Sequence, residues 1–157
     1  EAFYHRYCMD AEYLDLAEKL PEEKLNWNTY DRMIKANIRL KRYDKAVYWS
    51  KKDIARIGLL EIIKYSVLAQ DFDSALDYLK KLCDSAPSNF DFIADLAKLA
   101  QKQNKQNMLI SEIENITKED DKIWVPWQIL AKIYETYQNE SEKNKCLEKV
   151  REIRSKY

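Results

Sequence analysis

The sequence predicts an all-α fold built from repeated helical hairpins, and three observations support this prediction. The chain of 157 residues contains one glycine and three prolines, too few to supply the turns of an all-β protein. No segment shows the strict apolar and polar alternation of a half-buried strand. Lys, Leu, Glu and Ala, which favour helices, dominate the composition instead. We therefore expect helices throughout.

A regular repeat, about 34 residues long, organises the chain from residue 56 onward. Apolar residues recur at this spacing without gaps, and within each repeat they follow the spacing of an amphipathic helix. Two columns come from the first helix of each hairpin: Ile62, Leu96 and Leu130, and Ile63, Ala97 and Ala131. Three columns come from the second helix: Ala75 and Leu109; Leu79, Ile113 and Leu147; and Leu82, Ile116 and Val150.

The first two elements fit this pattern more loosely. Residues 1–21 resemble the second helix of a partial repeat, since Met9, Tyr13 and Leu16 share a face and Pro21 follows. Residues 27–55 form the next repeat, with a first helix from Trp27 and a second helix from Tyr43. Tyr43 precedes its equivalent, Phe72, by less than one full repeat, which predicts a shortened exit from this repeat.

Three full repeats follow, over residues 56–89, 90–123 and 124–157. Polar connectors at 70–71, 103–105 and 138–140 divide each one into two helices. Breaker segments at 85–89 and 117–122 separate the repeats, and Pro126 suits the first turn of a helix. In the last helix, Leu147, Val150 and Ile153 form a single apolar stripe among charged residues, as expected of a terminal capping helix.

These repeats resemble the tetratricopeptide repeat, a helix-turn-helix unit of about the same length, strongly from residue 56 onward and more loosely before it. Its W-x2-L-G-x2-Y pattern is matched, with Ala in place of Gly, by Trp127, Leu130, Ala131 and Tyr134. Its A-x3-F…P pattern is matched, with Leu for the aromatic residue, by Ala75, Leu79, Leu82 and Pro87. The resemblance implies a right-handed α-solenoid of about four repeats, forming one domain over residues 1–157. It also implies a protein or peptide partner in the concave groove.

A column of lysines in the first helices is the candidate ligand-binding set: Lys35, Lys64, Lys98 and Lys132. In the family that these repeats resemble, this column lines the groove where peptides lie. There the lysines would grip acidic side chains or a terminal carboxylate. The alternative is that they are ordinary solvent-facing helix residues, which would give them no role in binding.

Catalysis is not expected from this sequence. His5 is the only histidine, so a nucleophile has a single candidate base, and no glycine-rich phosphate loop is present. Cys8, Cys83 and Cys146 are widely separated, which argues against a zinc site or a disulfide framework and weakly favours a cytoplasmic location. We expect no metal and no cofactor.

Charge and hydropathy narrow the class of partner. The 27 basic and 27 acidic residues give no net charge, so we expect no nucleic-acid binding and no membrane insertion. The primary hypothesis is a scaffold or adaptor for a protein or peptide. Two alternatives stay open: a regulatory or targeting segment of a larger enzyme or signalling protein, and an RNA-binding helical repeat.

The two ends of the sequence differ in character. Phe3, Tyr4 and Tyr7, followed by Met9 and Tyr13, make the first helix more apolar than a terminal cap would be. We therefore expect the chain to be the C-terminal part of a longer protein. We also expect it to self-associate through its N-terminal end.

Overall fold

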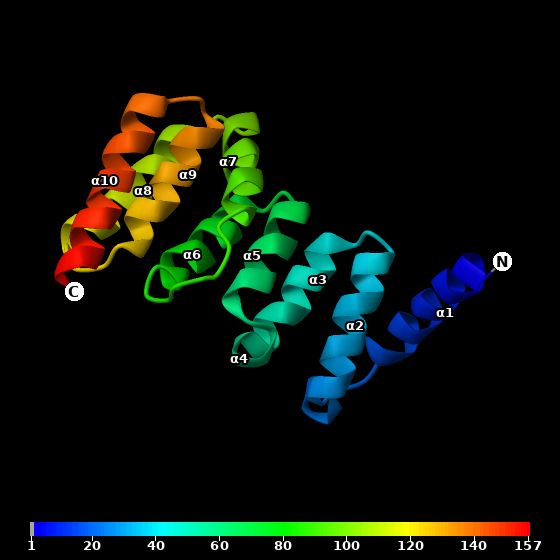
Figure 1. Cartoon of the computed structure of the whole chain (residues 1–157). Helices are drawn as coiled ribbons and strands as arrows, with labels where there is room; N and C mark the ends of the chain where they lie inside the picture. Colours follow the sequence, from blue (N-terminus) through cyan, green and yellow to red (C-terminus); the bar gives the residue numbers. More distant parts are fainter. Residues whose placement is uncertain (1) are drawn as a thin grey trace. The chain divides into compact units, whose positions relative to one another are not determined.

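The computed structural model describes residues 2–157 of the chain, with side chains from Met9 onward, and no strand occurs in this part (Figure 1). It divides between Asp71 and Phe72 into two compact units. Unit 1 contains α1 (Ala2–Ala17), η1 (Glu22–Lys24), α2 (Trp27–Arg39), α3 (Tyr43–Ser50), η2 (Lys51–Asp53), α4 (Ile54–Ile57) and α5 (Leu59–Leu68). Unit 2 contains α6 (Phe72–Leu82), α7 (Phe92–Lys102), α8 (Gln106–Glu119), α9 (Val125–Thr136) and α10 (Glu140–Lys156). The all-α prediction is confirmed, whereas the right-handed superhelix and the single domain stay predictions.

The turn between the two helices of each hairpin has one recurring conformation. In the described part of the chain, four residues other than glycine adopt φ values between 56° and 61°: Lys41, Gln70, Asn104 and Gln138. In every case the next residue donates its backbone N–H to the carbonyl five positions earlier, at distances from 2.7 to 2.9 Å. The left-handed residue itself donates to the carbonyl three positions earlier, at 3.0 to 3.2 Å. These two bonds define the Schellman ending of a helix.

These turns follow the spacing of the apolar columns. Gln70, Asn104 and Gln138 follow one another at intervals of one full repeat. Lys41 precedes Gln70 by the same short interval that separates Tyr43 from Phe72. The backbone therefore repeats with the period that the side chains predicted, including the one short repeat.

The short repeat owes its length to its exit. Gly58 alone connects α4 to α5, whereas nine residues connect α6 to α7 and five connect α8 to α9. Its φ of 89° and ψ of 147° lie in a region that other residues rarely adopt. The shortened exit predicted from the sequence is thus made by the one glycine in the chain.

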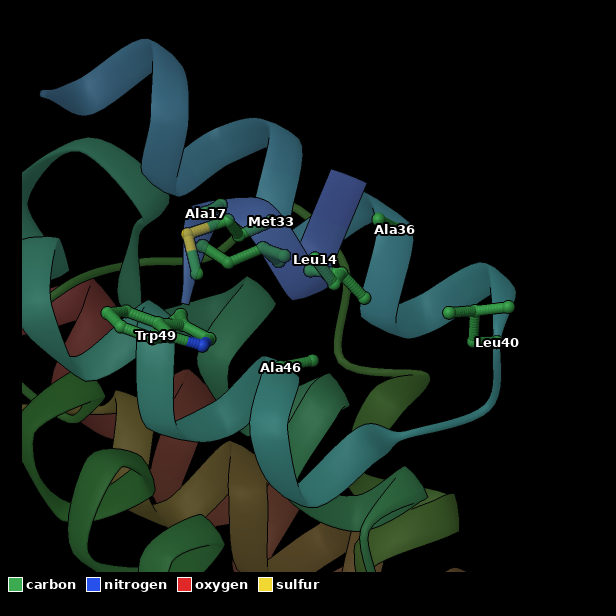
Figure 2. Packing of buried hydrophobic residues seen from close by; sticks show 8 residues of the cluster. Leu14, Ala17, Met33, Ala36, Leu40, Ala46 and Trp49 are labelled. Atoms are coloured by element: carbon green, nitrogen blue, oxygen red, sulfur yellow. The ribbon is translucent and has the colours of Figure 1, made fainter. Parts of the chain in front are cut away.

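The core of unit 1 lies where α1, α2 and α3 meet (Figure 2). Its buried residues come from all three helices and from the residue that follows α2, Leu40: Leu14, Ala17, Met33, Ile34, Ala36, Leu40, Ala46 and Trp49. At the edge of this core, Arg39 of α2 donates two hydrogen bonds to the Asp10 carboxylate of α1, at 2.6 and 2.8 Å. This bidentate pair holds α1 against α2. The predicted apolar cluster of Phe3, Tyr4 and Tyr7, like His5 and Cys8, lies outside the described side chains.

The core of unit 2 surrounds α9, which packs against α7, α8 and α10. The predicted columns are buried here, since Leu96, Ala97, Leu130 and Ala131 are each at most 2% exposed. The Tyr137 hydroxyl at the end of α9 also donates a 2.7 Å hydrogen bond to the Ala97 carbonyl of α7. The side chains of Ala97 and Ala131 are small, and they therefore allow α7 and α9 to approach closely.

Along the described chain, no helix is both long enough and apolar enough to cross a membrane.

Candidate functional site

The four predicted lysines lie on the first helices of their hairpins. Lys35 of α2 and Lys64 of α5 belong to unit 1, and Lys98 of α7 and Lys132 of α9 belong to unit 2. Three of the four have a carboxylate neighbour. Lys35 pairs with Asp31 at 2.8 Å, and Lys64 pairs with Glu61 at 3.7 Å.

Lys132 is held more firmly than the other lysines. Its Nζ lies 3.1 Å from Glu135 on the same helix and 3.6 Å from Asp91, which precedes α7. The hydrogen bond to Glu135, followed by the charges of Glu135 and Asp91, raises the pKa of Lys132, although desolvation opposes the shift. A ligand carboxylate would compete with these partners. The role of the lysine column in binding stays a prediction.

A separate groove lies on unit 2, and we call it the α8–α10 groove. It has a volume of about 1010 Å³. Its lining comes from α8 (Glu114, Thr117 and Lys118), α9 (Trp127, Leu130 and Tyr134) and α10 (Glu142, Lys145, Cys146, Glu148, Lys149, Arg151, Glu152 and Ser155). None of the four predicted lysines is in this set, so the structure offers a candidate site that the sequence did not predict.

The floor of the groove is apolar, and its phenol and thiol groups are neutral at physiological pH. Leu130 and Cys146 are buried, and the Trp127 and Tyr134 rings are half-buried. The Tyr134 hydroxyl donates to the Glu114 carboxylate at 3.3 Å. Burial, together with the charge of Glu114, raises the pKa of Tyr134 to about 12, so the phenol stays neutral at physiological pH. Burial also raises the pKa of the Cys146 thiol to about 11, which makes it a poor nucleophile.

The rim of the groove is charged, with both signs present. Lys145 pairs with Glu142 at 3.1 Å, and Lys149 approaches Glu152 at 3.5 Å. Among the described residues, four charged side chains of the lining have no ionic partner: Lys118, Arg151, Glu114 and Glu148. An apolar floor with a charged rim is the usual composition of a surface that binds part of another polypeptide.

The sequence did not reveal this groove, and its residues explain why. Trp127, Leu130 and Tyr134 match the spacing of a helix interface, and this spacing predicts core positions. That interpretation is right for Leu130, whereas the two aromatic rings are partly exposed. Spacing along one helix does not say how far apart α8 and α10 lie, and that separation opens the groove.

Unit 1 has a smaller hollow of about 350 Å³, beside the start of α2. The Arg56 guanidinium lies 5.0 Å from the centre of the Trp27 ring and 3.2 Å from the Asp53 carboxylate. The Arg56 guanidinium therefore already contacts the Trp27 ring face and the Asp53 carboxylate, the two groups that a cationic ligand would bind.

Over the part of the chain with described side chains, no group of three or more His, Cys, Asp or Glu residues is arranged to hold a metal ion. Cys83 is 1% exposed, and burial together with Asp84 raises its pKa to about 12.

Comparison with known proteins places this chain in no established family. No protein-family profile matches it, and a search of curated proteins finds no significant relative. Among solved structures, it is similar to a chain named MamA MSR-1 C2, at 15% sequence identity and a TM-score of 0.47. That match covers 98% of this chain and 92% of the other. A mutant of MamA is similar at 14% identity and a TM-score of 0.47, covering 96% and 92% of the two chains.

Proposed function

We propose that this chain is a helical-repeat module of the tetratricopeptide type that binds a segment of another polypeptide and performs no catalysis itself. The recurring turns at Gln70, Asn104 and Gln138 support the repeat assignment, because their spacing equals the length of that repeat. Repeat proteins of this kind leave long exposed surfaces between neighbouring helices, and binding is their usual use.

The α8–α10 groove is the single observation that carries this proposal. Its volume of about 1010 Å³ leaves room for part of another polypeptide chain. The floor offers aromatic and aliphatic surface to the apolar face of such a segment, and the rim offers charges to its flanks. The preferred ligand is therefore a short amphipathic helix.

A peptide library displayed on phage tests the proposal and separates the two candidate surfaces. Peptides selected on the natural protein would be measured against a groove variant, Lys118→Glu with Arg151→Glu, and a column variant, Lys64→Glu with Lys98→Glu and Lys132→Glu. We expect the groove variant to lose at least about tenfold in affinity, because like charges at a rim oppose binding. We expect the column variant to bind normally.

Lys122→Glu is the matched control, since Lys122 is exposed in the turn before α9 and does not line the groove. All variants should keep the natural circular dichroism spectrum. Loss of binding in the column variant alone would assign the ligand to the lysines instead. Selected peptides that bind all variants equally would refute both sites.

A further inference from the structure

The hollow beside the start of α2 already holds one positive charge, that of Arg56. Its guanidinium lies 5.0 Å from the centre of the Trp27 ring and 3.2 Å from the Asp53 carboxylate. The Arg56 side chain is nevertheless 59% exposed, and it extends from α4, a helix of four residues. An exposed ion pair and an exposed contact between a cation and a ring are each weak. Arg56 can therefore leave the hollow at small cost, and its position shows that a guanidinium fits there.

The hollow offers a cation more groups than these two. A second carboxylate, that of Asp31, and a second ring, that of Tyr30, also line it. Asp31 pairs with Lys35 at 2.8 Å, but the Lys35 side chain is 61% exposed and does not line the hollow. A guanidinium has five N–H donors in one plane, so it can bond carboxylates at its edge while its face contacts a ring.

The charges and rings of the hollow favour a cation over an anion. The charged residues of its lining are Asp31, Asp53 and Arg56. Once Arg56 has left, two carboxylates remain, and counting Lys35 beside them still leaves one negative charge. The faces of the two aromatic rings carry the negative part of their charge distribution, and they also attract cations. The vacated hollow therefore matches one cationic side chain.

We propose that this hollow binds an arginine side chain of a partner polypeptide, which displaces Arg56 from the face of Trp27. Arginine fits better than lysine, because a planar guanidinium stacks on a ring and bonds carboxylates at its edge, whereas an ammonium is a compact point charge. The hollow belongs to unit 1 and the α8–α10 groove to unit 2, so this inference adds a second site and does not depend on the first.

Titration of the whole chain with a blocked arginine, N-acetyl-arginine amide, tests this inference. The indole N–H signals of isotope-labelled tryptophans, followed by nuclear magnetic resonance, report where the probe binds. In the natural chain the Trp27 signal should move as the probe is added. Arg56→Ala should lower the Kd of the probe at least about fivefold, because the resident side chain no longer competes. Adding Asp53→Asn to this variant should raise the Kd again at least about fivefold.

Two further probes and one matched variant serve as controls. N-acetyl-citrulline amide has nearly the shape of the arginine probe without its charge, and it should leave the Trp27 signal unmoved. Blocked lysine should bind at least about threefold more weakly than blocked arginine. Arg154→Ala uncovers the Trp124 ring, from which Arg154 lies 4.5 Å away without a carboxylate partner among the described residues. The Trp124 signal of that variant should hardly respond to the probe.

Several outcomes would overturn the inference. A Trp27 signal that stays unmoved in the Arg56→Ala chain would refute the site. Equal affinities of the natural and Arg56→Ala chains would also refute it, because a ligand that displaces Arg56 must bind more tightly in its absence. An equal response to the citrulline probe would mean that the rings bind by shape and not by charge. All variants should keep the natural circular dichroism spectrum, since Arg56 and Arg154 are exposed.

Discussion

The rings of Phe90 and Trp124 lie 6.3 Å apart between centroids and are tilted by 54°, and these residues are separated by one full repeat. The same relationship occurs in unit 1, where Arg56 lies over the Trp27 ring and the two residues are separated by the one short repeat. In each pair, the two residues hold equivalent positions in successive repeats, near the start of the first helix of the hairpin. These contacts therefore join neighbouring repeats, in addition to the contacts between core columns.

Replacing Trp124 with Ala should lower the free energy of unfolding by about 1–3 kcal/mol, because the half-buried ring contacts Phe90 on one side and Arg154 on another. Urea denaturation followed by circular dichroism measures this loss. Arg154→Ala is the matched control and should cost no more than about 1 kcal/mol, since it removes the cation alone. Equal midpoints for the two variants would show that the ring contact with Phe90 adds nothing.

Gly58→Ala should lower the free energy of unfolding by about 1–3 kcal/mol through backbone strain alone. A side chain at this position would meet no atom within 4 Å, so crowding contributes nothing. Thermal unfolding of the variant measures the cost. A variant as stable as the natural chain would mean that this joint tolerates an ordinary backbone conformation.

Gln138→Gly should raise the free energy of unfolding by about 0.5–1 kcal/mol, because glycine adopts a left-handed conformation without the steric cost borne by other residues. The φ of Gln138 is 61°, which lies in this left-handed region. The measurement is the urea midpoint, compared with that of Gln128→Gly inside α9. The control should be destabilised, because glycine inside a helix is unfavourable.

Ala97→Trp or Ala131→Trp should each lower the free energy of unfolding by about 1–3 kcal/mol. Both alanines are at most 2% exposed, and a large ring there would force α7 and α9 apart. Urea midpoints report the effect. Unchanged midpoints in both variants would contradict the assignment of this column to a close helix contact.

Stability should fall at alkaline pH. Burial raises the pKa of Cys83 from 9.0 to about 12 and that of Cys146 from 9.0 to about 11. Above about pH 9 the unfolded chain binds fewer protons than the native one, so the free energy of unfolding decreases as pH rises toward the native values. The measurement is urea denaturation between pH 8 and pH 11. Replacing both cysteines with Ala should flatten this decrease, and an unaltered slope would exclude the thiols as its cause.

Much of the fold could be predicted because the apolar spacing and the backbone period coincide. The column of Leu96 and Leu130 is buried as expected, and the short interval from Tyr43 to Phe72 correctly located the shortened exit. Even so, the residues that turn the chain between paired helices could not be identified. Lys41, Gln70, Asn104 and Gln138 carry no common side chain, and their left-handed conformation is imposed by the Schellman hydrogen bonds.

The candidate site was less accessible to prediction than the fold. The lysine column was visible because its members repeat in the sequence, yet Lys35, Lys64 and Lys132 all have acidic neighbours in the structure. The α8–α10 groove was not visible, because its lining mixes core positions such as Leu130 with surface positions such as Lys118. Only the packing of three helices brings these residues to one surface.

The single-residue joint at Gly58 also determines where the molecule can carry added sequence. A short epitope or a fluorescent label inserted between α4 and α5 would displace helices, because no loop is present there to absorb it. The segments 83–91 and 120–124 are true loops, and lengthening a loop costs little, roughly 0.6 kcal/mol for each doubling. Added sequence therefore belongs in these two loops, and not in the joint at Gly58.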